Sequence, residues 1–415
     1  MKKKDETIRL LVPRAAADRL QSHLTRRGFI RLGGAAMGGW VLVACGGDSA
    51  GTTAATATTA ATGTTAATAT TAGTATTAAP TGEIGGNLSI YTWAEYQNPE
   101  NEAAFEADTG VDVIVDIYES NEAAIAKLEL AGASAGYDIV VPTSGFIKLM
   151  VAKDLLLEMD MSRMPNVANI DPAIAALQNT DGIAGLYSVV KDWGSTGWVY
   201  DASVITEPLV TWGDFLTAAA MPDVTGLVSV LGAPGDVTGI VFWRDGIDWN
   251  TTDPAHLDHA EEVLLTELAP HLKAFDSYPG VTLVAGEYVL SQAWNGDARV
   301  AVIEDPERYK WGLGAPKTEL WVDTWAILKS AANVDAAYAW INNILDPAVS
   351  AKEIEWHGYD TAVLGTQEHL PADLPAPEII FFTEEEKSRL VAGEVNEAQD
   401  RIVEIYNNLQ AAAGV

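Results

Sequence analysis

The chain has 415 residues, of which 48% are hydrophobic and 20% are charged, a balance typical of folded globular proteins. This length exceeds that of one ordinary hydrophobic core, so two lobes are expected. The formal net charge is -32, and such an acidic surface repels nucleic acid and attracts cations from a distance. Because many exported proteins are acidic for solubility alone, the charge argues against nucleic-acid binding and identifies no ligand.

The N-terminal segment carries an export and anchoring signature. A twin-arginine pair, Arg26 and Arg27, precedes an apolar run of residues 32–44 that ends at Cys45, the one cysteine of the chain. Small residues before a cysteine resemble a bacterial lipobox, in which the exported thiol is acylated. Residues 1–45 are therefore predicted to be a lipoprotein signal peptide, and an intrachain disulfide is excluded.

Residues 46–86 are composed almost entirely of Thr, Ala and Gly. They have no hydrophobic periodicity and cannot bury enough surface to offset the entropy of ordering, which predicts a flexible tether. A lipid anchor followed by a long tether places the folded part just outside a membrane, in the periplasm or at the cell surface. This location excludes cytosolic metabolism.

The folded part begins at about residue 87 and alternates short apolar strands with amphipathic helices. In chain order, the pattern predicts a strand at 88–91, a helix at 99–108, a strand at 111–118, a helix at 121–131 and a strand at 137–141. Strand–helix–strand alternation with short connections predicts an α/β fold, with a largely parallel sheet and helices on both faces.

Several short blocks along residues 87–410 share one family pattern. They are YTWAEY at 91–96, YESNE at 118–122, YDIVVPT at 137–143, WG at 193–194, TWGDF at 211–215, NTTDP at 250–254, WNG at 294–296, WVD at 321–323 and GY at 358–359. In order and spacing they resemble the spermidine/putrescine-binding proteins of bacterial ABC importers. Each block is short, and the ordered set is what makes the resemblance specific.

The resemblance implies the two-lobed type II periplasmic-binding-protein fold, with a hinged cleft between the lobes. Matching the blocks places lobe one at 87–197 plus 321–367 and lobe two at 198–320 plus 368–415. It implies a monomeric binding protein without cofactor or catalytic residues, which holds a small cationic solute, a polyamine, in the cleft and delivers it to the importer's permease.

A polyamine site needs aromatic walls against methylene groups, and carboxylates or π faces at each ammonium. The resemblance implies ligand contacts for Trp93, Tyr96, Trp294, Trp321, Asp323 and Tyr359. Asp323 is expected to anchor an ammonium group, with Trp321 as a wall beside it. Further candidates are a second carboxylate at Glu95, the hydroxyl groups of Thr143 and Ser144, and the carboxylate of Asp236.

The chain departs from the family pattern at three points. One acidic residue expected in lobe two falls at Ala233, which leaves Asp236 alone, and Gly145 stands where the family has a tyrosine. The C-terminal amide contact of the family has no clear match. Fewer carboxylates favour a ligand with fewer positive centres, so a diamine such as putrescine is expected ahead of spermidine.

Other signals favour different chemistry and are weaker. The run GASAG at 132–136 matches a hydrolase nucleophile elbow, but a helix precedes it and a strand follows, which is the reverse of the required order. His256 and His259 lack a third ligand for zinc nearby, so no metal is expected. No phosphate-binding P-loop motif is present. The alternatives are the same fold binding another solute, such as a sugar or another amine, as a transport or sensor protein, and an extracellular hydrolase.

Overall fold

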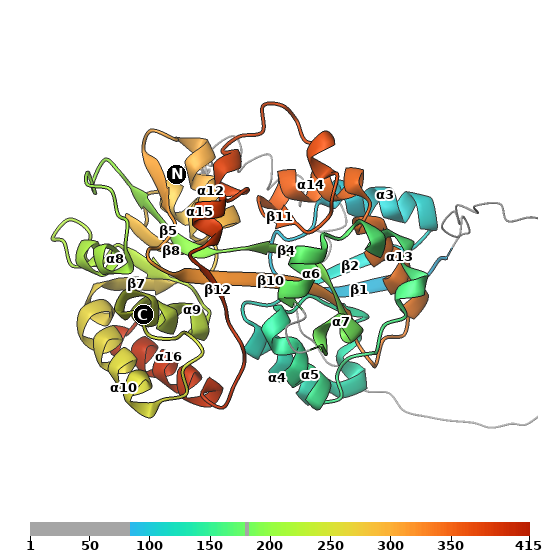
Figure 1. Cartoon of the computed structure of the whole chain (residues 1–415), viewed down its shortest axis with the longest axis horizontal. Helices are drawn as coiled ribbons and strands as arrows, with labels where there is room; N and C mark the ends of the chain where they lie inside the picture. The colour runs from blue at the N-terminus through green and yellow to red at the C-terminus, as the bar shows by residue number, and fades with distance from the viewer. Residues whose placement is uncertain (1–83, 179–181) are drawn as a thin grey trace, which may run out of the picture. The chain divides into compact units, whose positions relative to one another are not determined.

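The structure is a computed structural model that describes residues 84–178 and 182–415, all within one compact unit (Figure 1). The predicted signal peptide with Arg26, Arg27 and Cys45, and nearly all of the predicted tether, lie outside the described residues. Among the helices of the described part, none is both long and apolar enough to span a bilayer.

The larger of two sheets has seven strands in the order β11-β4-β10-β3-β1-β2, with β12 paired to β10. Its strands are β1 (Asn87–Thr92), β2 (Asp112–Ile117), β3 (Ile139–Val140), β4 (Ser188–Gly194), β10 (Thr318–Ile327), β11 (Asp360–Thr361) and β12 (Leu390–Ala392). The helices of this part of the chain are α3 (Pro99–Thr109), α4 (Asn121–Ala131), α5 (Ile147–Ala152), α6 (Pro172–Gln178), α7 (Ala184–Tyr187), α13 (Val334–Ile344) and α14 (Pro347–His357).

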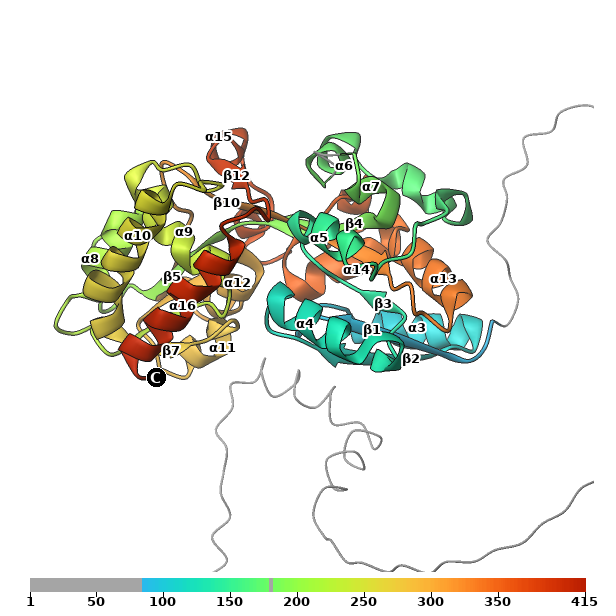
Figure 2. The same ribbon diagram turned by 90° about the horizontal axis from the view of Figure 1, so that it is seen from below.

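The smaller sheet has five strands in the order β7-β6-β8-β5-β9. They are β5 (Thr196–Asp201), β6 (Val228–Val230), β7 (Leu272–Phe275), β8 (Leu290–Trp294) and β9 (Tyr309–Gly312). The remaining helices are α8 (Trp212–Ala219), α9 (Pro234–Asp245), α10 (Pro254–Val263), α11 (Pro279–Val284), α12 (Asn295–Glu304), α15 (Glu384–Lys387) and α16 (Gln399–Ala413). Figure 2 shows α9, α10 and α16 packed together beside this sheet.

The five elements predicted first in the chain all form. The Asn98 side chain caps α3 by accepting from the Glu100 amide, and Ser120 caps α4 in the same way through the Ala123 amide. α4 has the predicted bounds, whereas β3 is shorter than predicted, because only Ile139 and Val140 pair with neighbouring strands. Local sequence therefore positions the first β-α-β-α-β unit well.

The prediction that the sheets are mostly parallel needs correction. Of the ten strand pairs in the described residues, five are parallel and five are antiparallel. The antiparallel pairs involve β10 with β3 and β4, β4 with β11, and β5 with β8 and β9. Strands β5 and β10 follow crossings between the two sheets rather than simple β-α-β units, so their direction is not set by a helical crossover.

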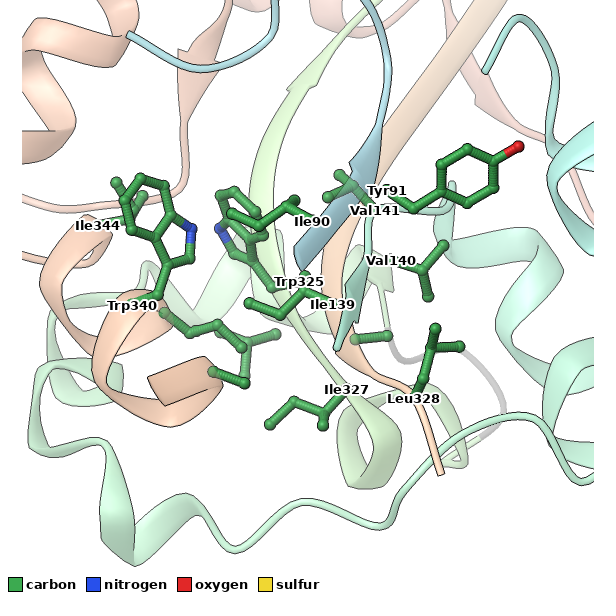
Figure 3. Packing of buried hydrophobic residues seen from close by; sticks show 14 of the residues in the cluster. Ile90, Tyr91, Ile139, Val140, Val141, Trp325, Ile327, Leu328, Trp340 and Ile344 are labelled. Atoms are coloured by element: carbon green, nitrogen blue, oxygen red, sulfur yellow. The ribbon is translucent and has the colours of Figure 1, made fainter. Parts of the chain in front are cut away.

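Each sheet has its own core of buried side chains. Beneath the larger sheet, Trp325 of β10 packs edge-on against Trp340 of α13, with ring centroids 6.3 Å apart, beside Ile90 and Ile139 (Figure 3). Beside the smaller sheet, the fully buried Trp198, Trp212 and Trp243 form a second cluster. Many of the tryptophans therefore serve ordinary core packing.

The chain passes between the sheets at Ser195, the single residue between β4 and β5. The start of β10 lies beside this crossing, where the Ser195 hydroxyl donates to the Glu319 carbonyl at 2.6 Å (Figure 1). The C-terminal strand β12 also pairs here with β10, although residues 368–415 were expected in lobe two. Side chains from both sheets can therefore meet along β4 and β10.

Candidate functional site

The segment after β1 places two aromatic side chains at the carboxyl end of this strand. Trp93 and Tyr96 follow the last residue of β1 and both are buried. The Trp93 Nε1 donates a hydrogen bond to the Val141 carbonyl, 3.0 Å away, which fixes the indole beside the end of β3. Parallel strands that end together expose their following loops on one edge of a sheet, where ligands bind in α/β proteins.

The Tyr96 hydroxyl lies between two buried carboxyl groups. Its oxygen is 2.7 Å from Asp323 Oδ2 and 2.6 Å from Asp192 Oδ1, and the Thr143 hydroxyl donates to Asp323 Oδ1 at 2.7 Å. These groups meet because Asp192 and Asp323 are register partners in the β4–β10 pair. Burial, reinforced by the charge of Asp192, raises the pKa of Asp323 to about 7, so this carboxyl group changes charge near neutral pH.

Lys191 supplies a buried positive charge beside this cluster. Between Asp192 and Val190, strand β4 has one residue more than β10, and the extra residue is Lys191, at a β-bulge. Its Nζ lies 2.6 Å from Asp192 Oδ2 and 3.6 Å from the centroid of the Tyr96 ring, and its side chain is 2% exposed. An ammonium group held by a carboxylate and an aromatic face is the chemistry that a bound amine requires.

Trp321 forms a wall next to Asp323. It stands two residues before Asp323 on β10 and therefore on the same face of the strand. Its indole meets Tyr359 edge-on, with ring centroids 4.9 Å apart. Gly194 is its register partner on β4, and a Cβ there would lie 2.4 Å from the indole. A glycine at this position is therefore needed for the indole to lie against β4.

A second group of side chains joins the N-terminal segment to the smaller sheet. The rings of Trp93 and Trp294 meet edge-on, with centroids 5.6 Å apart, and the Trp294 Nε1 donates to Asp236 Oδ1 at 3.1 Å. The Ala94 amide donates to the Tyr278 hydroxyl at 3.0 Å. The segment that follows β1 of the larger sheet thus contacts β8 of the smaller sheet and the residue that precedes α11.

Asp236 has an acidic neighbour that comes from β10. The Thr196 hydroxyl lies between Asp236 Oδ1, at 2.8 Å, and the Glu319 carboxyl group. Burial, together with the charge of Asp236, raises the pKa of Glu319 well above its ordinary value. Both carboxyl groups are buried, with 9% and 6% of their residue surfaces exposed.

Eight of the ten predicted ligand-binding residues lie in these two groups, which are linked through segment 93–96 and strand β10. They are Trp93, Tyr96, Thr143, Asp236, Trp294, Trp321, Asp323 and Tyr359. Their role in binding a ligand remains a prediction, while their proximity is a property of the fold.

Glu95 and Ser144 lie outside these two groups. Glu95 is exposed, with φ of 55°, and its carbonyl oxygen accepts a hydrogen bond from the Trp356 Nε1 at 3.1 Å. Its residue surface is exposed, although Trp93 and Tyr96 beside it in the sequence are buried. Ser144 is half-buried and begins the short turn that follows Thr143.

Sequence patterns missed Lys191, Asp192, Thr196 and Glu319. A signal was present for three of them, because Lys191 and Asp192 interrupt an otherwise apolar strand, and Glu319 alternates with Trp321 along another. Charged residues on fully buried strands are unusual and mark functional or paired positions.

The features that suggested other chemistry have structural roles. His259 Nε2 lies 2.8 Å from Asp245 Oδ2, and His256 Nδ1 lies 2.9 Å from the Thr251 hydroxyl. The small-residue run forms a turn at Gly132–Ala135 between α4 and β3, which is not the strand-to-helix turn that a hydrolase nucleophile requires.

The chain matches the family described as bacterial extracellular solute-binding protein over residues 101–378. It is 31% identical over 305 residues to the spermidine/putrescine-binding periplasmic protein 1 of Haemophilus influenzae, covering 72% of this chain and 82% of that protein. It is 29% identical over 339 residues to the spermidine/putrescine-binding periplasmic protein of Escherichia coli, covering 80% of this chain and 94% of that protein.

Solved structures share the fold as well. A structure from Listeria monocytogenes, described as a spermidine/putrescine ABC transporter, superposes with a TM-score of 0.71 at 28% sequence identity, covering 79% of this chain and 99% of that one. The two-sheet α/β architecture is therefore that of periplasmic solute-binding proteins.

Proposed function

We propose that this chain, which belongs to the bacterial extracellular solute-binding protein family, binds a polyamine and delivers it to the permease of an ABC importer. Its relatives include binding proteins named for spermidine and putrescine. The chain acts as a carrier, without catalysis, and the acidic surface raises the rate at which a cation is captured.

One observation carries this proposal: a buried carboxyl group stands among aromatic rings where the two sheets meet. Asp323 is 5% exposed and lies beside Tyr96, which also contacts the Tyr359 ring. A carboxylate compensates the loss of water around an ammonium group, and aromatic faces contribute roughly 0.5–2 kcal/mol per cation contact. A neutral sugar can donate hydroxyl hydrogen bonds to this carboxylate but cannot neutralise its charge.

We further propose that the protein works as a lipid-anchored monomer outside the cytoplasmic membrane. The twin-arginine pair Arg26–Arg27, Cys45 and the Thr-rich tether support this proposal, together with the periplasmic location of the named relatives. Closure of the two lobes around the amine would create the form that docks on the permease.

A ligand screen by thermal unfolding, followed by calorimetry, tests the proposed function. Putrescine, spermidine, amino acids and neutral sugars are each added to the purified protein at equal concentration. A ligand at about 100 times its dissociation constant stabilises the folded state by about 2.7 kcal/mol, which raises the melting temperature clearly. Stabilisation by polyamines is the expected result, and a response to sugars without any response to amines would overturn the proposal.

Polyamine affinity should increase as the pH rises from about 5 to about 8, because protons compete with the ammonium group for Asp323. With a pKa of about 7, protonation weakens binding up to about tenfold for each pH unit below that value. The same raised pKa means that the folded state holds the extra proton, so this group's contribution to stability without ligand falls from about pH 4 to pH 7. Calorimetric titrations of the wild type and of Asp323→Asn, which should show a flatter profile, test this dependence.

A further inference from the structure

We propose that Glu319 is a second cation-binding residue, so that the site holds a short diamine with one ammonium group at Asp323 and the other at Asp236 and Glu319. This inference rests on the proposed polyamine function and adds a specificity-determining residue to it. Glu319 lies outside every sequence block that suggested the function, and the acidic position expected at Ala233 is lost.

The register of β10 aligns the two carboxyl groups. Glu319, Trp321 and Asp323 alternate along a continuous stretch of the strand, so all three side chains project from one face. Their partners on strands β4 and β5 support this, because Asp323 pairs with Asp192, Trp321 with Gly194, and the Glu319 carboxyl group contacts Thr196. An indole thus lies between two carboxyl groups, and its Nε1 has no hydrogen-bond partner within the described residues.

The end of the site at Asp236 and Glu319 lacks the partner cation that some other buried acids have. Asp192 is paired with Lys191 and Asp201 with Arg308. Within the part of the chain that the structure describes, no lysine, arginine or histidine lies within 4.0 Å of Asp236 or Glu319. Two buried carboxyl groups without a cation are costly unless they share a proton or receive a positive charge from a ligand.

The spacing favours a short diamine. Four residues of an extended strand span about 13 Å, and two charge-assisted contacts of about 2.8 Å leave roughly 7 Å between two nitrogens. An extended chain advances about 1.2 Å per bond, so the nitrogens of putrescine lie about 6 Å apart and the terminal nitrogens of spermidine about 11 Å apart. The aromatic rings of Trp321 and Trp294 would then cover the methylene groups.

The test compares a diamine with its matched monoamine. Putrescine and 1-aminobutane are titrated into the wild type, Glu319→Gln and the control Glu353→Gln. Glutamine keeps the size of the side chain and its contact with the Thr196 hydroxyl while removing the charge. We expect Glu319→Gln to weaken putrescine binding at least about tenfold and to change 1-aminobutane binding less than about twofold.

The control replaces another buried glutamate, whose partners are Asn98 and Asn101 and which lies off this face of β10. Glu353→Gln should leave the ratio of the two affinities unchanged, whatever it does to stability. If Glu319→Gln does not fold, Asp236→Asn is tested in its place. We expect it to reduce the affinity for putrescine relative to that for 1-aminobutane by the same factor.

Each outcome separates this inference from the proposed function. Suppose that the wild type binds putrescine and that Asp323→Asn loses this binding, while Glu319→Gln keeps the wild-type ratio of putrescine to 1-aminobutane affinity. In that case Glu319 has a structural role only, and this inference fails while the proposed function stands. If the wild type binds no amine, the proposed function fails and this inference falls with it.

Discussion

Replacing Asp323 with asparagine is expected to weaken polyamine binding at least tenfold, or about 1.4 kcal/mol, with little loss of stability. Removing one member of a buried, hydrogen-bonded charge pair costs about 2–5 kcal/mol of binding energy, much of it from the ammonium left unpaired. Asparagine fills the same volume and can accept the hydrogen bond that the Thr143 hydroxyl donates. It also removes the repulsion between two carboxyl groups that both lie against Tyr96, so the free protein should not be destabilised.

Isothermal titration calorimetry with putrescine and spermidine measures the affinity, and urea unfolding measures the stability. Asp360→Asn is a matched control, because burial also raises the pKa of Asp360 to about 7, while its backbone pairs with Trp193 on the outer strand β11. The control should bind within about twofold of the wild type. Unchanged affinity of Asp323→Asn would remove this residue from the binding site.

Local order along the chain was enough to predict where Trp93 and Tyr96 lie. Trp93 and Tyr96 directly follow a β-branched and aromatic strand, so they must lie at its carboxyl end, where α/β folds hold ligands. The prediction that these two residues and Asp323 contact a ligand came from the family resemblance, and the fold places Asp323 beside both Tyr96 and Thr143.

The rest of the site depends on pairing between distant strands, which local patterns do not contain. Glu319 reaches Asp236 only because the β10 register places it opposite Thr196, over 120 residues earlier in the chain. Glu95 shows the effect of backbone conformation: its neighbours Trp93 and Tyr96 are buried, whereas Glu95, with a positive φ, is exposed. Strand register and the backbone conformation of a single residue are both set by the tertiary fold. A register shift of one residue, or a change in one residue's backbone conformation, can move a side chain to another face.

Lys191 is the buried charge whose loss should cost the most stability. Lys191→Met removes the cation from a carboxylate that is 0% exposed, and breaking such a pair costs about 3–5 kcal/mol. The cation also lies over the Tyr96 ring, a contact that methionine cannot replace. Burial already raises the pKa of Asp192, and Lys191 is the main influence that lowers it.

The sign of the pH dependence distinguishes this loss from a simple packing defect. Without Lys191, the pKa of Asp192 in the folded state rises further, so the folded state binds a proton that the unfolded state has released. The destabilisation should therefore be small near pH 4 and should grow as the pH rises toward neutrality. A cavity or a poorly packed methionine would destabilise the protein equally at both pH values.

Urea unfolding of three variants at about pH 4.5 and pH 7.5 measures the loss of stability and its pH dependence. The double variant Lys191→Met/Asp192→Asn should recover much of the stability that Lys191→Met loses, because neither charge then remains buried. Lys329→Met breaks an exposed pair with Asp154, whose side chains are 53% and 79% exposed, and should cost less than about 1 kcal/mol. Equal unfolding midpoints for Lys191→Met and Lys329→Met at neutral pH would show that the bulge in β4 holds no stabilising charge pair.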